Sequence, residues 1–220
     1  MTGKHPINVE QLKILLQQRR IFQPRFRLPL NLDDAVELLY AAVVNEVAYR
    51  GNTFVPSQPI NECIQQAAAW CIDNRKMGLM LCGLPGNGKT TVMNAICQVF
   101  NLFDFKDVYG EPVRIRSVSA VEVAQMAKSN YKAFKNLCYN PFLAIDDFGE
   151  EPVEVLEYGN VLSPIIDMLS IRYSEQSLTI LTTNTAANKI RERYGARIAD
   201  RFNEMMQVII FTNPSYRGKK

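Results

Sequence analysis

The hydrophobic positions along the chain form short apolar runs separated by segments with helical spacing. Continuous runs of strand length occur near residues 79–82, 142–146, 178–183 and 207–211, and alternation over 113–118 predicts a half-exposed strand. A continuous apolar run bounded by turn residues is typical of a strand buried on both faces, so these strands predict a parallel sheet. Together with the helical segments between them, they predict a doubly wound α/β fold: a five-stranded sheet sandwiched by helices.

Helical spacing dominates the chain before the first strand. Helices are predicted over residues 9–20, 31–51 and 59–75. A further helix is predicted over 155–173, broken or restarted at Ser163-Pro164, because serine and proline suit the N-cap and first turn of a helix.

A phosphate-binding loop is the clearest candidate for chemistry. Residues 83–90 follow the pattern G-x-x-x-x-G-K-T between an apolar strand and a helical segment. Glycines let backbone N–H groups surround an anion at the helix start, Lys89 would reach the β- and γ-phosphates, and Thr90 would help hold Mg²⁺. The alternative is a Gly/Pro turn with an exposed lysine. The predicted ATP-binding residues are Gly83, Pro85, Gly86, Asn87, Gly88, Lys89, Thr90 and Thr91.

Polar side chains follow two later strands. Asp146 and Asp147 end the apolar run 142–146, and parallel strands deliver such acids to the carboxyl edge of a sheet. There Asp146 would hold Mg²⁺ and Asp147 would orient or deprotonate a water molecule. Asn184 follows strand 178–183 and could touch the γ-phosphate or that water. In isolation, the acids could form a simple turn, and asparagine is itself a turn-forming residue.

Two arginines share one face of a predicted helix near the end of the chain. Arg197 and Arg201 are four residues apart, so their side chains project together. They could be a surface pair satisfied by Asp200 or Glu204, or they could reach the phosphates of a neighbouring subunit as an arginine finger. Spacing alone favours the surface pair.

The composition is that of a soluble globular protein. The chain of 220 residues is long enough for one α/β domain and a short extra segment. No apolar run approaches the about 20 residues that span a bilayer, so no membrane partner is predicted. The five cysteines lack C-x-x-C spacing and His5 is the only histidine, which argues against a zinc site. We expect reduced, mostly buried thiols in a cytoplasmic protein that lacks a signal peptide.

The net charge of +3 is unevenly distributed. Residues 1–30 carry six lysines and arginines against one glutamate, and residues 211–220 carry three basic residues and no acid. Such ends could touch nucleic acid or could be solvated tails. We divide the chain into a basic helical segment, 1–50, and a core, 51–220.

Two shorter features remain open at this stage. Arginine and phenylalanine alternate with prolines over residues 21–30, which suits contact with single-stranded nucleic acid or a linker packed on a neighbour. Asn52, Thr53 and Phe54 are candidates for contact with a nucleotide base, because the segment before the loop strand often passes the base.

Taken together, these motifs resemble those of AAA+ ATPases. Their order is the loop 83–90, the strand end 144–149, Thr182-Thr183-Asn184 and the segment 195–202. More narrowly, the chain resembles the DnaC-like helicase loaders and the IstB-like transposition helper ATPases over roughly residues 50–217. Its ending, Pro214-Ser215-Tyr216-Arg217, is also similar to the end of that group.

The resemblance implies a role for each site residue. It implies that Lys89 and Thr90 bind ATP and Mg²⁺, with Asp146 as the metal-facing acid. It implies that Asp147 is the catalytic carboxylate and Asn184 the sensor. Arg201, with Arg197 beside it, becomes the expected arginine finger. The implied partners are further copies of the chain joined through ATP, a replicative helicase or transposase, and single-stranded DNA.

The chain departs from the AAA+ pattern at several points. Asp147 stands where many members have glutamate, although relatives in this group also carry Asp-Asp. No helical lid with a second sensor arginine follows the last strand, and Arg217 could partly substitute. The N-terminal segment shows no recognisable helicase-docking motif.

Three functions remain to be separated. The leading hypothesis is an ATPase that loads or remodels a partner on DNA, with turnover that is slow or stimulated by that partner. The alternative is an ATP-switched binding module with negligible turnover. A small-molecule P-loop kinase is disfavoured, because no arginine-rich acceptor lid lies between the later strands.

Overall fold

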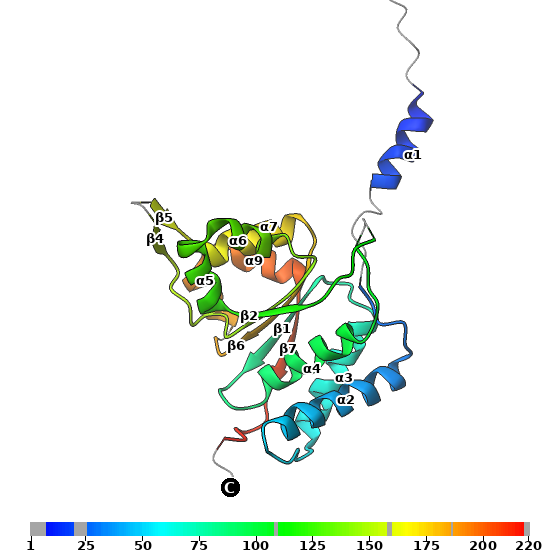
Figure 1. The fold of residues 1–220 in the computed structure, drawn as a ribbon, viewed down its shortest axis with the longest axis vertical. Helices are drawn as coiled ribbons and strands as arrows, with labels where there is room; N and C mark the ends of the chain where they lie inside the picture. The colour runs from blue at the N-terminus through cyan, green and yellow to red at the C-terminus, as the bar shows by residue number, and fades with distance from the viewer. Residues whose placement is uncertain (1–7, 20–25, 108–109, 158–159, 186, 218–220) are drawn as a thin grey trace, which may run out of the picture.

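The structure of the protein is a computed structural model that describes residues 8–19, 26–107, 110–157, 160–185 and 187–217 (Figure 1). No helix in these ranges is both long and apolar enough to cross a membrane. Residues 20–25, His5 and the two terminal lysines lie outside the described residues, so the predicted basic ends are only partly covered.

A five-stranded sheet forms the centre of the molecule, and all its neighbouring strands are parallel. This confirms the predicted sheet. In spatial order its strands are β2 (Arg116–Ser119), β3 (Phe142–Asp146), β6 (Leu178–Thr183), β1 (Gly78–Gly83) and β7 (Met206–Phe211).

Strand β2 is shorter than the alternation over 113–118 predicts. Val113 and Ile115 are buried as expected, but their backbone N–H groups bond elsewhere. The Val113 N–H donates to the carbonyl of Phe105 (2.8 Å), and the Ile115 N–H donates to the side chain of Asn101 (2.9 Å). Because these donors are already used, the ladder with β3 begins only at Arg116.

Helices cover both faces of the sheet (Figure 1). One face packs against α2 (Leu32–Tyr49), α3 (Gln58–Ile72) and α4 (Lys89–Asn101). The other packs against α5 (Ala120–Ser129), α6 (Tyr131–Cys138), α7 (Pro164–Ser174), α8 (Ala187–Tyr194) and α9 (Ala196–Met205). The remaining elements are α1 (Val9–Arg19) and a hairpin of β4 (Val155–Glu157) and β5 (Asn160–Leu162).

The hairpin corrects the helix predicted over 155–173. Residues 155–157 and 160–162 form strands, and the helix begins only at Pro164, after Ser163. The reason is visible in the sequence: valines and a glycine occupy the segment, and β-branched residues around a turn glycine favour strands. Helical periodicity alone did not distinguish the two.

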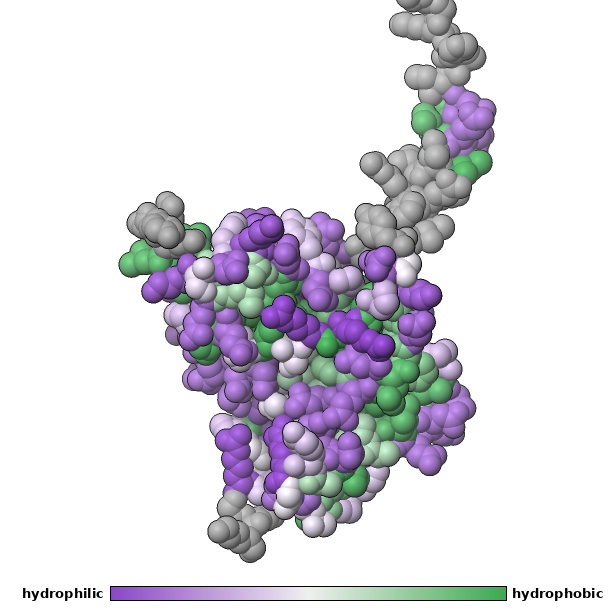
Figure 2. All heavy atoms as spheres, viewed as in Figure 1, coloured by the Kyte–Doolittle hydropathy of each residue, from purple (hydrophilic) through white to green (hydrophobic). Residues whose placement is uncertain are grey.

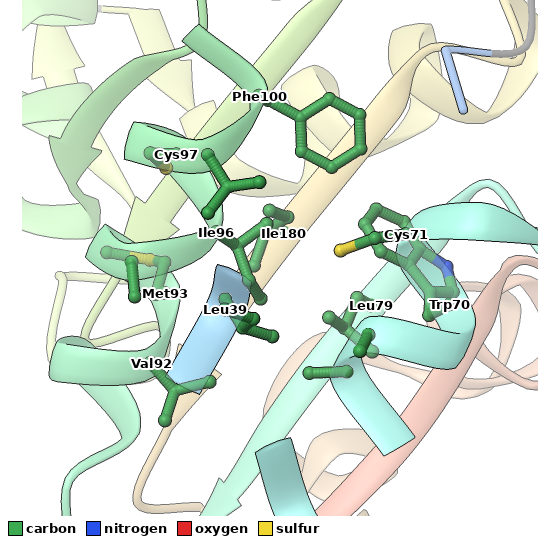
Figure 3. Close-up of a cluster of buried hydrophobic side chains, with 14 of the residues drawn as sticks. Leu39, Trp70, Cys71, Leu79, Val92, Met93, Ile96, Cys97, Phe100 and Ile180 are labelled. Atoms are coloured by element: carbon green, nitrogen blue, oxygen red, sulfur yellow. The ribbon is translucent and has the colours of Figure 1, made fainter. Parts of the chain in front are cut away.

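The core on the α2–α4 face joins distant parts of the chain. Figure 3 shows Leu39 of α2, Trp70 of α3 and Phe100 of α4 converging on Leu79 and Ile180 of the sheet, all almost fully buried. All five cysteines are free and buried, as predicted.

Helix α2 packs directly on the nucleotide-loop helix α4. Its Glu46, which is 8% exposed, accepts hydrogen bonds from Asn94 and Gln98 of α4. The division at residue 50 stays a prediction, but α2 shares one hydrophobic core with α3 and α4.

Phe26, which closes the arginine–aromatic segment, is also part of this core. Its ring stacks on Phe142 with centroids 6.3 Å apart and meets Phe105 edge-on. The next arginine, Arg27, is paired with Asp73 at 3.3 Å. This described end of the segment therefore packs on the hydrophobic core as a linker would.

Candidate nucleotide-binding site

The loop between β1 and α4 has the backbone of an anion cradle. Gly86 and Gly88 have φ of +81° and +97°, a region that side chains with a Cβ rarely occupy. Gly88 is the N-cap of α4 and has no side chain to cap the first N–H groups of the helix. The start of α4 therefore presents its free N–H groups toward the loop.

Lys89 lies at the centre of this cradle and is 5% exposed. Its Nζ donates to the carbonyls of Gly83 and Leu84, both at 2.8 Å, and to Asn87 Oδ1 at 3.1 Å. Burial lowers the pKa of Lys89, and the carboxylates of Asp147 and Asp146 oppose that shift. An anion bound in the loop would add a counter-charge for this buried ammonium.

Thr90 of the loop and Asp146 of β3, the two residues predicted to hold Mg²⁺, are in contact. The Thr90 hydroxyl donates to Asp146 Oδ1 at 3.0 Å, and the buried Thr182 hydroxyl donates to the same oxygen. A hydroxyl and a carboxylate are hard oxygen ligands of the kind that Mg²⁺ accepts. The residues present therefore fit a magnesium ion held with the help of substrate phosphates.

Asp147 has a backbone conformation that is rare for a residue with a side chain, at φ +52°. Its N–H donates to Thr182 Oγ1 at 2.9 Å, which anchors the turn to β6. Burial raises the pKa of Asp147, and the charges of Asp146 and Glu150 raise it further. A raised carboxylate pKa moves this group toward the range of a general base.

Asn184 lies at the same sheet edge. It follows Thr183, the last residue of β6, which is paired with Cys82 of β1. Asn184 therefore lies beside the end of the strand that leads into the loop. Its side chain is exposed. The sheet order places β6 between β1 and β3 and so brings the loop, the acidic pair and Asn184 together.

Arg197 and Arg201 do not join that cluster through any described contact. Arg201 donates to Ser170 Oγ at 2.5 Å, and its guanidinium lies 5.1 Å from the ring centroid of Tyr173. The acids expected to satisfy a surface pair have other partners: Asp200 is paired with Arg191 at 3.1 Å, and Glu204 accepts from the Tyr173 hydroxyl.

The three residues proposed to contact a nucleotide base, Asn52, Thr53 and Phe54, differ in their exposure to solvent. Asn52 and Thr53 are exposed, whereas Phe54 packs edge-on against Tyr40 with centroids 5.3 Å apart. The side chains beside the loop are instead Ile60 and Tyr216, each 3.8 Å from the position of a Cβ added at Gly88.

Residues 211–217, the C-terminal strap, cross the loop and were not predicted to do so. The Asn87 side chain donates to the carbonyl of Phe211 (3.1 Å), and the Asn213 side chain donates to the carbonyl of Asn87 (2.8 Å). The Tyr216 N–H donates to the carbonyl of Gly86 (2.9 Å). Asn213 is 2% exposed, and its Oδ1 has no hydrogen-bond partner among the described residues.

The strap also explains why residue 86 is a glycine. A Cβ there would lie 2.3 Å from Ser215 Oγ and 3.0 Å from Arg217 Cγ. The sequence signal for the strap was the ending Pro214–Arg217, which carried a family resemblance but no spatial information.

A buried carboxylate links the acidic turn to helix α8. Glu151, 1% exposed, accepts from the Gly149 N–H at 2.8 Å and from the Tyr194 hydroxyl, and the rings of Phe148 and Tyr194 stack 4.7 Å apart. Sequence reasoning missed this link because it joins residues 43 positions apart.

Comparison with known proteins identifies the fold. No protein-family model matches the chain, and no curated protein matches it. Among solved structures, the DnaC helicase loader is similar with a TM-score of 0.56 and 19% identity, over 72% of this chain and 93% of that one. DnaI is similar with a TM-score of 0.59 and 20% identity, over 82% and 93%.

A third similar structure is DnaA from Aquifex aeolicus bound to AMPPCP. Its TM-score is 0.51 and its identity 18%, over 71% of this chain and 48% of that protein. At these identities the similarity is one of fold. The chain therefore has the α/β fold, with a five-stranded parallel sheet, that is seen in the structures of the DnaC helicase loader and of DnaI.

Proposed function

We propose that the protein is a Mg²⁺-dependent ATPase that serves DNA replication or transposition as an accessory protein. The observation that carries the proposal is the hydrogen bond between Thr90 of the loop and Asp146 of β3, with Lys89 buried in the cradle beside them. This combination is the minimum that a P-loop site needs to hold phosphates and a metal.

Each residue has a role that its position supports. The loop N–H groups and Lys89 bind the phosphates, and Thr90 and Asp146 hold the ion. When bound, Mg²⁺ neutralises charge that develops on the phosphates. Asp147 accepts a proton from the attacking water, and Asn184, at the same edge, orients that water or contacts the γ-phosphate.

The site is completed by a neighbouring copy of the chain. Arg201, with Arg197 one turn before it, supplies the arginine finger. Two facts support this: the acids near these arginines have other partners, and no described contact joins either arginine to the loop of its own chain. A head-to-tail contact of this kind builds rings or open spirals.

The partners that we propose are a replicative helicase or a transposase, and single-stranded DNA. Support comes from the name of one similar structure, the DnaC helicase loader. Another similar structure is DnaA bound to AMPPCP and single-stranded DNA. The basic segment 1–50 would contribute to these contacts, and residues 51–220 would form the ATPase core.

The first experiment measures nucleotide binding and phosphate release by purified protein, with and without single-stranded DNA. We expect binding that Lys89→Ala weakens by roughly 10- to 100-fold, because a charge-assisted hydrogen bond is lost. Binding with no phosphate release under either condition would instead support the ATP-switched binding module, and absence of binding would refute both.

The second experiment addresses the arginine finger. Arg201→Ala should keep ATP binding but lose most hydrolysis that depends on assembly, by roughly 1000-fold. Arg197→Ala, one helical turn away, is the matched control. Unchanged turnover in Arg201→Ala would disprove the assignment, and loss only in Arg197→Ala would transfer it to the neighbouring residue.

A further inference from the structure

The β4–β5 hairpin carries an apolar pair with nothing packed on it. Leu156 and Val161 are directly opposite each other across the two strands, so their side chains share one face. They are 67% and 58% exposed. Figure 2 shows hydrophobic side chains gathered over this hairpin at the edge of the molecule. A two-stranded hairpin is marginally stable in water by itself, so a covered face would stabilise it.

The charge around this pair is of one sign. Residues 150–162 contain four glutamates and no lysine or arginine. Glu151 is buried against Tyr194, but Glu150 and Glu154 are exposed. The surface that covers the hairpin should therefore combine an apolar floor with a cationic rim.

The same chain contains such a surface. A cavity of about 770 Å³ lies where α9 meets the start of β7 and the residues that precede β1. Phe202, Met206 and Val208 contribute its apolar floor. Val208 belongs to β7, an edge strand of the described sheet, and is 42% exposed.

The rim of this groove is basic. It carries Arg75, Lys76 and Arg191. Lys76 Nζ donates to the carbonyl of Asn203 at 2.7 Å, and Arg191 is paired with Asp200 at 3.1 Å. These contacts hold both cations at the rim while leaving their side chains exposed.

We propose that the hairpin of one copy docks into the groove between α9 and β7 of a second copy. Leu156 and Val161 cover the apolar floor, and Glu154 faces the basic rim. Within one chain, β4 lies against α5, and none of the described hydrogen bonds or ion pairs joins the hairpin to the groove. The two surfaces differ, so the contact is heterologous and can continue from copy to copy.

This contact is separate from the proposed ATP-bridged interface. It uses neither the loop nor Arg201, so it is expected in nucleotide-free protein. With ATP bound, the two contacts would strengthen each other by holding the same neighbours together.

The test is self-association of the full chain by sedimentation equilibrium, without nucleotide and with a non-hydrolysable ATP analogue. Leu156→Asp should weaken nucleotide-free association roughly tenfold or more, because a central apolar contact is replaced by a charge. Glu154→Lys and Lys76→Glu should each weaken it, and the double variant should recover it in part, because the charges are exchanged. Glu37→Lys, a change on the exposed face of α2, is the matched control.

Circular dichroism and nucleotide affinity show whether each variant is folded. If the folded Leu156→Asp variant self-associates as strongly as the wild type, the proposal is overturned. It is also overturned if the folded double variant self-associates more weakly than both single variants. A wild-type chain that stays monomeric without nucleotide also overturns it. Loss of a helicase or transposase contact in Leu156→Asp, with self-association intact, would assign the hairpin to that partner. None of these outcomes depends on ATP hydrolysis.

Discussion

Thr182 shows how one hydroxyl can organise two functional groups. Its Oγ1 donates to Asp146 and accepts from the N–H of Asp147, and the residue is fully buried. Because Thr182 sits on β6 and the acids follow β3, the register of the two strands sets the position of both carboxylates.

Thr182→Val should remove both hydrogen bonds of the Thr182 hydroxyl while keeping the shape of the side chain. The N–H of Asp147 would lose its acceptor and Asp146 one donor, at a cost of about 1–3 kcal/mol in the free energy of unfolding. Mg²⁺-dependent nucleotide affinity should fall as well. Thr182→Ser keeps the hydroxyl, so its affinity should stay near that of the wild type. Denaturant unfolding and nucleotide titration measure both effects, and equal affinities for the two variants would contradict the role.

Asp147→Asn should stabilise the protein while abolishing turnover. The folded-state pKa of Asp147 is raised above its ordinary value. Its contribution to stability is therefore present at low pH and is lost as the pH rises through the raised pKa. Asparagine cannot ionise and tolerates positive φ. At pH 7 the variant should be more stable by up to about 0.5 kcal/mol, a small value because the side chain is largely exposed. At pH 3 the two should be equal.

Phosphate release should fall about 100-fold or more in Asp147→Asn, since a general base is lost. ATP affinity should be kept. A variant that is less stable than the wild type at pH 7 would show that the carboxylate is not penalised by burial and neighbouring charge.

At the scale of elements, the C-terminal strap is hydrogen-bonded to the phosphate-binding loop that it crosses. Strand β7 carries the chain to the carboxyl edge of the sheet beside β1, and the strap then passes over Gly86 and Gly88. Hydrogen bonds run in both directions between the strap and Asn87 or Gly86. A change in the loop backbone on nucleotide binding would therefore shift the strap residues that are hydrogen-bonded to it.

Asn213→Ala should loosen this connection. The buried side-chain bond to the carbonyl of Asn87 would be lost, which should lower the free energy of unfolding by about 1–2 kcal/mol. If half of that cost falls on the loop geometry, nucleotide affinity weakens roughly two- to fivefold. Thr212→Ala, an exposed strap position, is the control. Reduced stability with unchanged affinity would make Asn213 a structural anchor only.

For the whole molecule, the sheet order gathers part of the proposed site at one edge of the sheet, while Arg201 lies elsewhere. The central strands β3, β6 and β1 gather the acids, Asn184 and the loop at one edge. Arg201 instead rests on Tyr173 and Ser170 of α7. If the proposed assembly is correct, the catalytic constellation exists only where two copies meet.

Mixing two inactive variants tests this directly. Lys89→Ala has an impaired loop that binds nucleotide weakly and Arg201→Ala lacks the proposed finger, but a contact between the two variants can unite an intact loop with an intact Arg201. At equal amounts, random head-to-tail assembly should restore about a quarter of wild-type turnover. Steady-state phosphate release over a range of mixing ratios measures it. A mixture with no more activity than its components would show that both groups act within one chain.

The sequence by itself determined the sheet and placed the polar candidate residues at its edge. Continuous apolar runs predicted four of the strands because both faces of a central parallel strand are buried, and alternation over 113–118 predicted the fifth, which is shorter in the structure. The phosphate-loop pattern predicted the cradle because only glycine adopts the backbone that the turn requires. The residues Lys89, Thr90 and Asp146 follow from those two facts, and the structure brings them together.

The tertiary structure alone decided the features that depend on contacts between distant residues. The C-terminal strap on the loop, the Glu151–Tyr194 link and the partners of Asp200 and Glu204 join positions that no local pattern relates. The hairpin over 155–162 was mistaken for helix because short apolar segments fit both periods. A local motif such as the phosphate loop can be recognised from residue spacing along the chain. The contacts between distant residues form only when the sheet order brings their separate elements together.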